Sequence, residues 1–393
     1  MANTLKFGAG EWATKEGSTL AYNDENGNFK PLPFNFERAG SATRVNKEGL
    51  IEVVGNNEPR IDYKDNSEGA LLLEPTRTNR ITYSEDFSQS VWTDFNVTLN
   101  SSQSSPNGNS NAYLIEPTNS SFLLYTQSSV IASTEYTFSY FFKSGTKDAV
   151  KIAFYDDTAN SFIETNATQS FVDYGNGWKR IITSVTTPLG CTSLYSYIDR
   201  SSEVGTFYVW GAQLEQGSYA TSYIPTQGGI GTRVAESCQK QNIFNNIVSS
   251  QFPFSFFVEA DYKNQDDYFF SFINPNRNDS WFTIRFISGQ VVVISSSVAV
   301  QETFNTGFFA SNSERVKIAI TYDSVSKIRI SINGNDVLVK SNFNSQAVNT
   351  LINTILLGQL RIVSDNGLRN GILDFKAYNE ALTDQELINL TRI

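Results

Sequence analysis

The stretch VWGAQLEQGSYATSYIPT, residues Val209–Thr226, marks the end of one β-run and a change in composition. Its first half alternates as in a strand with one buried face, since one parity holds Tyr208, Trp210, Ala212 and Leu214. Small and turn-forming residues follow, and then the glycine-rich QGGIGT. We interpret the stretch as the closing strand of one β-domain, with Trp210 and Leu214 on its inner face, followed by a joint to a second domain.

Composition limits the classes of protein to which the chain can belong. Of 393 residues, 40% are hydrophobic and 18% are charged, which suits two or three domains with sizeable cores. The formal net charge is −10 and no Lys/Arg cluster is present, which argues against nucleic-acid binding. The chain has no histidine, so the commonest general base and metal ligand is absent.

Two cysteines, Cys191 and Cys238, lie on opposite sides of the proposed joint and in no metal-binding spacing. We expect two buried free thiols, because unpaired cysteine behaves mostly as a small hydrophobic residue. A single disulfide is the alternative.

The start of the sequence, ANTLKFGAGEWATKEG after Met1, lacks the charged and apolar regions of a secretory signal, and no run of about 18 apolar residues occurs. We therefore predict no cleaved signal peptide and no membrane insertion.

The part of the chain before the joint divides into two regions. Residues 1–80 are rich in Gly, Asn and Glu with short apolar islands, which predicts brief strands whose compactness depends on neighbouring parts. Residues 81–226 contain alternating runs such as EYTFSYFFKSG, with Tyr136, Phe138, Tyr140 and Phe142 on one parity. Short runs separated by Gly, Asn and Ser turns are typical of a β-sandwich. The polar LNSSQSSPNGNSNAY, residues 99–113, predicts a long exposed loop.

Residues 240–393 form a second β-series. The runs PFSFFVEADY and RVKIAITYD alternate, and Asn333-Gly334 between alternating runs predicts a hairpin. GILDFKAY adds a strand. A short terminal helix is expected after it, because Thr383 and Glu386 have the spacing of a capping box and Leu387 and Leu390 form an apolar stripe.

The predicted fold class is therefore all-β. We expect two tandem antiparallel β-sandwiches of the jelly-roll type, at 81–226 and 240–393, preceded by a small irregular β-rich region at 1–80. The glycine-rich stretch 226–239 is the predicted linker, and a fragment from about Gln239 to the end is expected to fold alone.

Several stretches of the sequence, taken together, resemble known protein families. NRITYSEDFSQSVWT, EYTFSYFFKSG, GNGWKRI and VWGAQLEQGSYATSYIPT resemble a jelly roll of the carbohydrate-binding-module type that is common in bacteriophage tail and fibre proteins. SATRVNKEGLIEVV and EPRIDY…GALLLEPTRTN resemble the segment that leads into it. RVKIAITYD…KIRISINGNDV and GILDFKAYNEALTDQEL resemble laminin-G or concanavalin A-like lectin domains. The resemblance runs from about Ser41 to the end.

The resemblance implies a non-enzymatic virion protein: a fibre, spike or decoration protein on the particle surface that attaches to host-surface glycans. It also implies a homotrimer, and residues 1–80 would bind other virion proteins. Two alternatives remain open: a purely structural decoration protein without a ligand, and a fibre-borne glycan hydrolase.

Candidate carbohydrate-binding residues are aromatic side chains close to polar ones, because rings stack on the apolar faces of sugars while polar groups bind the hydroxyls. We expect the stretch 264–281 to be a binding loop, since it holds Tyr268, Trp281 and Arg277 beside Asn274, Asn276 and Asp279. Trp92 is a further candidate. The alternative for Trp92 and Trp281 is packing as core or rim residues, which is what we expect of Trp178 and Trp210.

Structural calcium is an open alternative, because lectin-like sandwiches often hold an ion through oxygen ligands. Carboxylates for it occur in SEDF (84–87), YDD (155–157) and NQDD (264–267). No catalytic residue is predicted: serine or cysteine catalysis lacks its histidine, and no phosphate-binding glycine loop is present.

Overall fold

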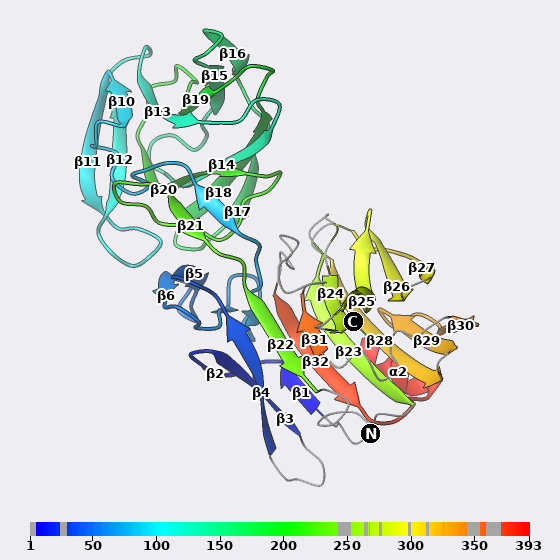
Figure 1. Cartoon of the computed structure of the whole chain (residues 1–393). Helices are drawn as coiled ribbons and strands as arrows, with labels where there is room; N and C mark the ends of the chain where they lie inside the picture. The colour runs from blue at the N-terminus through cyan, green and yellow to red at the C-terminus, as the bar shows by residue number, and fades with distance from the viewer. Residues whose placement is uncertain are drawn as a thin grey trace. The chain divides into compact units, whose positions relative to one another are not determined.

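The structure is a computed structural model, and it describes residues 5–23, 30–242, 253–262, 266, 268–274, 277–297, 300–311, 314–324, 326–343, 354–358 and 371–393. The all-β prediction is confirmed: these residues form antiparallel sheets, with one short helix, α2 (Asp384–Thr391), among them (Figure 1). No helix in the described ranges is long and apolar enough to span a bilayer.

The chain forms two compact units whose boundaries differ from the predicted ones. Unit 1 consists of Met1–Ser41, Val54–Thr76 and Val234–Ile393, and unit 2 consists of Ala42–Val53 and Arg77–Arg233. The predicted separate region 1–80 is thus divided, and most of it belongs with the C-terminal part. The predicted linker 226–239 also contains strand residues, because β21 (Gly231–Arg233) pairs with β9 (Arg77–Asn79) and β22 (Ser237–Gln241) pairs with β4 (Lys30–Glu37).

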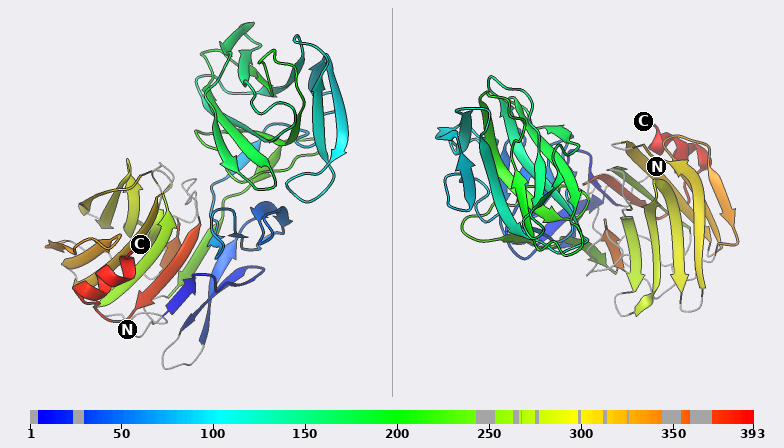
Figure 2. Two further views of the ribbon diagram at one scale, coloured as in Figure 1. Left: turned by 180° about the vertical axis from the view of Figure 1, so that it is seen from behind. Right: turned by 90° about the horizontal axis from the view of Figure 1, so that it is seen from above.

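Unit 1 has two layers of strands. In the first layer, β22 lies between β4 and β31, and the order continues from β31 through β24, β25 and β26 to β27. The strands that complete it are β31 (Thr354–Leu357), β24 (Tyr268–Asn274), β25 (Arg277–Ile287), β26 (Gln290–Ser297) and β27 (Val300–Phe309). The view from above in Figure 2 shows its green-to-yellow strands side by side.

The second layer of unit 1 has the order β1–β32–β23–β28–β29–β30. Its strands are β1 (Leu5–Gly8), β32 (Ile372–Tyr378), β23 (Phe254–Asp261), β28 (Arg315–Ser324), β29 (Lys327–Ile332) and β30 (Leu338–Ser341). The layers are linked because β3 (Ser18–Asn23) pairs with both β1 and β4. Short strands complete the unit: β2 (Ala13–Lys15), β7 (Ile61–Asp62) and β8 (Ala70–Leu71).

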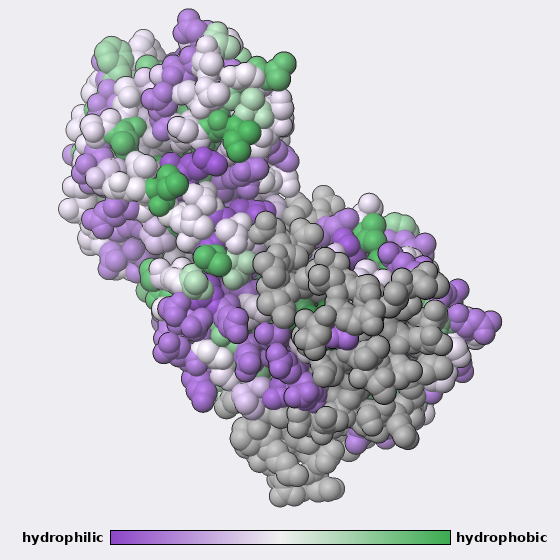
Figure 3. Space-filling view, in the orientation of Figure 1, coloured by the Kyte–Doolittle hydropathy of each residue, from purple (hydrophilic) through white to green (hydrophobic). Residues whose placement is uncertain are grey.

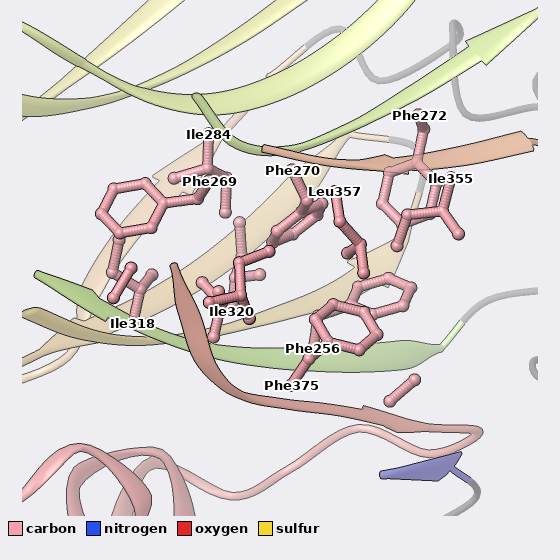
Figure 4. Close-up of a cluster of buried hydrophobic side chains, with 14 of the residues drawn as sticks. Phe256, Phe269, Phe270, Phe272, Ile284, Ile318, Ile320, Ile355, Leu357 and Phe375 are labelled. Atoms are coloured by element: carbon pink, nitrogen blue, oxygen red, sulfur yellow. The ribbon is translucent and has the colours of Figure 1, made fainter. Parts of the chain in front are cut away.

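The core of unit 1 is built by the alternation seen in the sequence. Phe256 of β23, Ile318 and Ile320 of β28 and Phe375 of β32 face Phe270, Phe272, Ile355 and Leu357 of the other layer (Figure 4). The buried parity of β23, from Phe254 to Tyr262, and that of β28, from Val316 to Tyr322, were both predicted and are confirmed. Burial of these large side chains drives the two layers together.

Helix α2 confirms the predicted capping box. The Thr383 side chain accepts a hydrogen bond from the Glu386 amide at 3.3 Å, and the Thr383 amide donates to Glu386 Oε2 at 2.8 Å. Leu387 is buried with Phe257 and Tyr378 of the second layer, and Leu390 packs against the same cluster. The Asn333-Gly334 turn is also present, with positive φ at both residues, between β29 and β30.

A fully buried charge cluster ties together the three chain segments of unit 1. Glu236 Oε1 accepts hydrogen bonds from Arg38 Nη1 at 2.8 Å and from Arg60 Nε at 2.6 Å. Its Oε2 accepts from Arg60 Nη2 and from the Glu74 amide, and Arg60 also pairs with Glu74 at 2.9 Å. Burial alone would lower the pKa of Arg60, but the carboxylates of Glu236 and Glu74 raise it above its ordinary value.

Unit 2 is a sandwich of a five-stranded and a six-stranded sheet, with the orders β10–β13–β19–β15–β16 and β11–β12–β20–β14–β18–β17. The first sheet contains β10 (Trp92–Phe95), β13 (Leu123–Ser129), β19 (Ser193–Tyr197), β15 (Ala153–Asp156) and β16 (Ser161–Glu164). The second contains β11 (Val97–Gln103), β12 (Ala112–Pro117), β20 (Phe207–Gln216), β14 (Glu135–Ser144), β18 (Trp178–Thr186) and β17 (Ser170–Asp173). β5 (Ala42–Val45) and β6 (Ile51–Val54) form a separate ribbon.

A β-bulge in β20 corrects one prediction about the closing strand. Trp210 and Leu214 were expected on the same face, but the register against β14 shifts between Ser139 and Phe141. Gly211 lies at this shift with φ +61°, and a Cβ there would approach Phe141 to 2.9 Å. Because the bulge reverses the parity, Leu214 packs inside the sandwich, whereas Trp210 packs in a second cluster with Phe141 and Tyr223.

The segment that follows β20 is held by buried polar groups. Glu215 accepts hydrogen bonds from the Thr221 amide at 2.8 Å and from the Thr221 hydroxyl at 2.7 Å. Asn79 donates to the carbonyl oxygens of Ala212 and Ile224. The small and polar residues of GSYATSYIPT therefore return the chain along unit 2 instead of carrying it away.

We predict that the fragment Gln239–Ile393 does not fold alone, contrary to the expectation from sequence. It lacks β1, β4 and the Arg38, Arg60 and Glu236 side chains. The strand edges of β32 and β22 that pair with β1 and β4 would therefore be exposed, together with part of the hydrophobic core. Calorimetry is expected to show no cooperative melting transition for this fragment, whereas a fragment Ala42–Arg233, which contains both segments of unit 2, melts cooperatively. A sharp transition for Gln239–Ile393 would contradict the division into units.

Glu236→Gln is expected to destabilise unit 1 by about 3–5 kcal/mol, because it removes the carboxylate that two buried arginines share. The control is Glu302→Gln, which removes the partner of Lys340 in a partly exposed pair at 3.5 Å and is expected to cost at most about 1 kcal/mol. Urea unfolding followed by circular dichroism measures both. Equal effects of the two substitutions would show that the buried cluster is not special.

Candidate functional site

Trp92, one of the predicted sugar-binding residues, is a buried residue of unit 2. It is 5% exposed, and its ring packs on Phe87 with centroids 4.6 Å apart. Its Nε1 donates to the Tyr83 carbonyl oxygen at 2.9 Å. The alternative of core packing therefore describes Trp92 better, and the same holds for Trp178 and Trp210, which are also buried.

The predicted binding loop 264–281 is largely a β-hairpin of unit 1, since β24 and β25 occupy most of it. Tyr268 is buried, its hydroxyl accepts from Arg285 Nη1 at 2.8 Å, and Arg285 lies over its ring. Trp281 is half-buried and pairs with Ile273, whereas Tyr268 pairs with Arg285 near the other end of the hairpin. Asn276 lies outside the described residues. For Arg277 and Asp279 the structure describes the backbone of strand β25 but not the side chains. Asn274 is buried.

The described residues hold no cluster of three or more acidic or cysteine side chains that could bind a metal ion. The carboxylates of SEDF and YDD accept hydrogen bonds from protein donors. Asp156 accepts from the amides of Thr158 and Ala159, and the partners of Glu85 and Asp86 are given below. Most of the stretch NQDD lies outside the described residues. Cys191 and Cys238 are both buried free thiols, as predicted, and burial raises the pKa of Cys191 to about 11.

Five aromatic side chains gather on the outer surface of the five-stranded sheet of unit 2. They come from four strands, and we call them the aromatic face: Tyr125, Tyr155, Phe162, Tyr195 and Tyr197. Tyr197 is buried by its neighbours, at 7% exposure. The alternate residues Leu124, Phe154 and Leu194 belong to the sandwich core. Because side chains of a strand alternate between faces, the aromatic residues point away from that core.

The rings of the aromatic face contact one another in a continuous set. Tyr195 stacks between Tyr125, at 4.9 Å, and Tyr155, at 5.6 Å. Phe162 contacts Tyr155 edge-on at 5.0 Å and lies 6.0 Å from Tyr197. Stacking covers part of the tyrosine faces, so these residues offer ring edges and hydroxyls, while Phe162 is 39% exposed. Mutual packing fixes the rings before any ligand arrives.

Polar groups surround the aromatic face. The Asp157 carboxylate accepts from Gln127 Nε2 at 2.9 Å and from Ser193 Oγ at 3.1 Å. A hydrogen bond from Tyr195 to Asp157, together with partial burial, raises the pKa of Tyr195 to about 12. At the other side, the Arg200 guanidinium lies 5.3 Å from the Phe162 ring centre. An apolar platform ringed by placed hydrogen-bonding groups is the usual composition of a small-molecule or sugar site.

Unit 2 also contains a pocket of about 820 Å³. We call it the Glu85 pocket, and its lining residues are Tyr83, Glu85, Asp86, Gln89, Ser101, Ser102, Ser110, Asn111, Tyr113, Pro225, Thr226 and Gln227. Part of the predicted exposed loop 99–113 thus lines a cavity: Ser101 and Ser102 lie within β11, near its end, and Ser110 and Asn111 precede β12.

Protein donors hold both carboxylates of the pocket in place. Glu85 accepts from Tyr223 OH at 3.0 Å and from Asn111 Nδ2 at 2.6 Å, and burial raises the pKa of Glu85 above its ordinary value despite these bonds. Asp86 accepts from Tyr113 OH and from Ser88 Oγ, both at 2.6 Å, and from Gln89 Nε2 at 2.8 Å. Partial burial would raise the pKa of Asp86, but these hydrogen bonds lower it to about 2.

On the view of unit 2 in Figure 3, hydrophobic residues are scattered among hydrophilic ones. This view therefore shows no single large apolar patch of the kind that marks a tight protein interface. The surface chemistry of unit 2, as far as this view shows it, is mixed.

Among the comparisons with known proteins, only the comparison with solved structures finds similar proteins. No protein-family model matches the chain, and no curated protein matches it. Domain 4 of the extracellular arabinanase AbnA from Geobacillus stearothermophilus, solved with arabinotriose, is 16% identical, with 44% of this chain and 82% of that one covered and a TM-score of 0.33. The sialidase CBM40 of Ruminococcus gnavus, bound to α2,6-sialyllactose, is 16% identical, with 39% and 97% covered and a TM-score of 0.30.

A further similar structure is the binding domain of botulinum neurotoxin DC in complex with SialylT, which is 17% identical, with 40% of this chain and 39% of that one covered and a TM-score of 0.31. Similarity at this level carries no conclusion about the ligand of this chain.

We predict that Asp86 stabilises unit 2 in a pH-dependent way. Because its folded pKa of about 2 lies below the unfolded value, its contribution is complete above about pH 4 and is lost as the pH falls toward 2. Asp86→Asn should therefore lower the melting temperature near neutral pH, and the difference from the unaltered protein should shrink between about pH 4 and pH 2. The control is the exposed Asp94→Asn; a difference for Asp86→Asn that does not change with pH would contradict the assignment.

Proposed function

We propose that the protein binds glycans through the aromatic face of unit 2. The observation that carries the proposal is the set of five contacting aromatic side chains on an outer sheet surface, with Asp157, Gln127 and Arg200 beside them. Core packing does not explain these rings, because the core of the sandwich is formed by the opposite parity of the same strands.

The geometry suits a sugar better than a purely apolar ligand. The exposed ring of Phe162 supplies a surface for the C–H face of a pyranose, and the tyrosines bring hydroxyl groups to the same surface of the sheet. Gln127 lies opposite Tyr195 on the neighbouring strand and donates a hydrogen bond to Asp157. Both Gln127 and Asp157 can also bind sugar hydroxyls. Tyrosine gives a large contact area at low entropy cost, which is why it is frequent in binding surfaces.

We place this activity in a bacteriophage virion protein, a fibre, spike or decoration protein on the particle surface that attaches to host glycans without catalysis. The support is the sequence resemblance described above. Weak binding at each copy would be strengthened by the number of copies, and a homotrimer would contribute to this. Since most of residues 1–80 is folded into unit 1, attachment to other virion proteins would use the surface of that unit and not a separate arm.

One observation favours a second candidate, the glycan hydrolase. Glu85 and Asp86 share a pocket and their pKa values move in opposite directions, a pattern also found in acid/base pairs. Under the leading proposal, incubation with host polysaccharide releases no reducing sugar. Release that is lost in Glu85→Gln would favour the hydrolase.

Tyr155→Ala and Phe162→Ala are each expected to weaken glycan binding by about 1–3 kcal/mol, or about 5- to 150-fold, because each removes a ring from the aromatic face. A glycan array with the full chain identifies the ligand, and titration calorimetry measures the loss. Phe171→Ala is the control, since Phe171 is an aromatic residue on β17 of the other sheet and is even more exposed than Phe162.

Melting temperatures separate a lost contact from a damaged fold, and the expected changes for these exposed or half-buried rings are small. Unchanged binding in both variants, or the absence of any bound glycan on the array, would overturn the proposal.

A further inference from the structure

The Glu85 pocket of unit 2 lies apart from the residues of the aromatic face and has a different chemistry. Its wall contains two carboxylates, Glu85 and Asp86, and no lysine or arginine among its lining residues. Two aromatic side chains, Tyr83 and Tyr113, contribute to the same wall. A low-dielectric cavity of one charge sign raises the local concentration of ligands of the opposite sign.

The carboxylates are rigid, whereas several hydroxyls of the pocket are free. Each carboxylate is fixed by two or more protein donors, as described above. By contrast, the hydroxyl groups of Tyr83, Ser101, Ser102 and Ser110 make no hydrogen bond to any residue that the structure describes. The pocket thus combines pre-set negative charge with unused donors and acceptors that can bind a hydroxylated ligand.

The fixed donors do not exhaust the carboxylates. A carboxylate oxygen has two lone pairs, and Glu85 accepts one protein hydrogen bond on each oxygen, from Tyr223 and Asn111. One acceptor site on each oxygen therefore remains for a ligand. An ammonium group has three donors and the opposite charge, so it can use these sites without disturbing the protein partners.

We propose that the Glu85 pocket is a second binding site of unit 2, for a small ligand that carries a primary ammonium and several hydroxyls, of the amino-sugar class. The pocket volume of about 820 Å³ admits a sugar of one or two residues. Carboxylated or sulfated sugars are excluded, because they would meet Glu85 and Asp86 without a compensating cation.

Titration calorimetry with the full chain tests this with glucosamine, glucose, glucuronate and calcium chloride. Glucosamine is expected to bind about tenfold more tightly than glucose, since a charge-assisted hydrogen bond is stronger than a neutral one. Glucuronate is expected not to bind. Tyr155→Ala leaves glucosamine binding unchanged, which distinguishes this site from the aromatic face, and a failure of either site leaves the other testable.

Glu85→Gln is the decisive variant, because glutamine keeps the shape and can still pair with Tyr223 and Asn111 while it removes the charge. It should abolish the preference for glucosamine over glucose. Glu135→Gln, which removes the same charge from an exposed position on β14, should leave the preference intact. Tyr83→Phe removes one free hydroxyl and should weaken the binding of glucosamine and of glucose to the same extent. Melting temperatures confirm that each variant is folded.

Four results would overturn the proposal: equal affinity for glucose and glucosamine, tighter binding of glucuronate, binding of calcium with no binding of glucosamine, or no binding of any sugar at millimolar concentration. Retained glucosamine preference in a folded Glu85→Gln protein would do the same, because the charge of Glu85 would then play no part.

Discussion

The burial of one carboxylate, that of Glu236, constrains the whole of unit 1. A carboxylate with no access to water is tolerated only when cations and donors replace its hydration. Arg38, Arg60 and the Glu74 amide do so here, and they come from segments more than 150 residues earlier in the chain. The C-terminal sandwich therefore requires the N-terminal segments to complete it, and in the sequence the two segments of unit 2 are inserted between the three segments of unit 1.

This constraint explains which part of the fold could be predicted from sequence. Period-2 alternation in β14, β23 and β28 predicts strands and their buried faces because each depends on neighbours only two residues away. The capping box of Thr383 and Glu386 is equally local. The pairing of β4 with β22 is not, since nothing in either strand specifies a partner 200 residues distant. The bulge at Gly211 is also hidden, because a single glycine within a strand is compatible with a regular or a bulged register.

The candidate site was partly predictable for a related reason. Tryptophan is the residue expected in sugar sites, but it is also large and apolar, and Trp92, Trp178 and Trp210 are used for packing. The signal for the aromatic face was present in SLYSY, where Tyr195 and Tyr197 alternate with Leu194 and Ser196. The sequence does not show which alternate residues of the strand face the other sheet. From sequence alone, these tyrosines could therefore equally have formed part of the core. The sequence offers the SEDF carboxylates as oxygen ligands, but the pocket around them depends on strands that meet only in the fold.

Trp92 links the two proposed sites although it contacts neither ligand in our proposals. Its Nε1 binds the carbonyl of Tyr83 and its ring packs on Phe87, so it fixes the segment that carries Glu85 and Asp86. The next residue, Thr93, pairs with Tyr125 of the aromatic face. One short segment thus contributes the wall of an anionic pocket and the edge of a sheet that presents aromatic rings. We infer that the buried Trp92 is a positioning residue for both proposed sites, which would act through the backbone of residues 83–93.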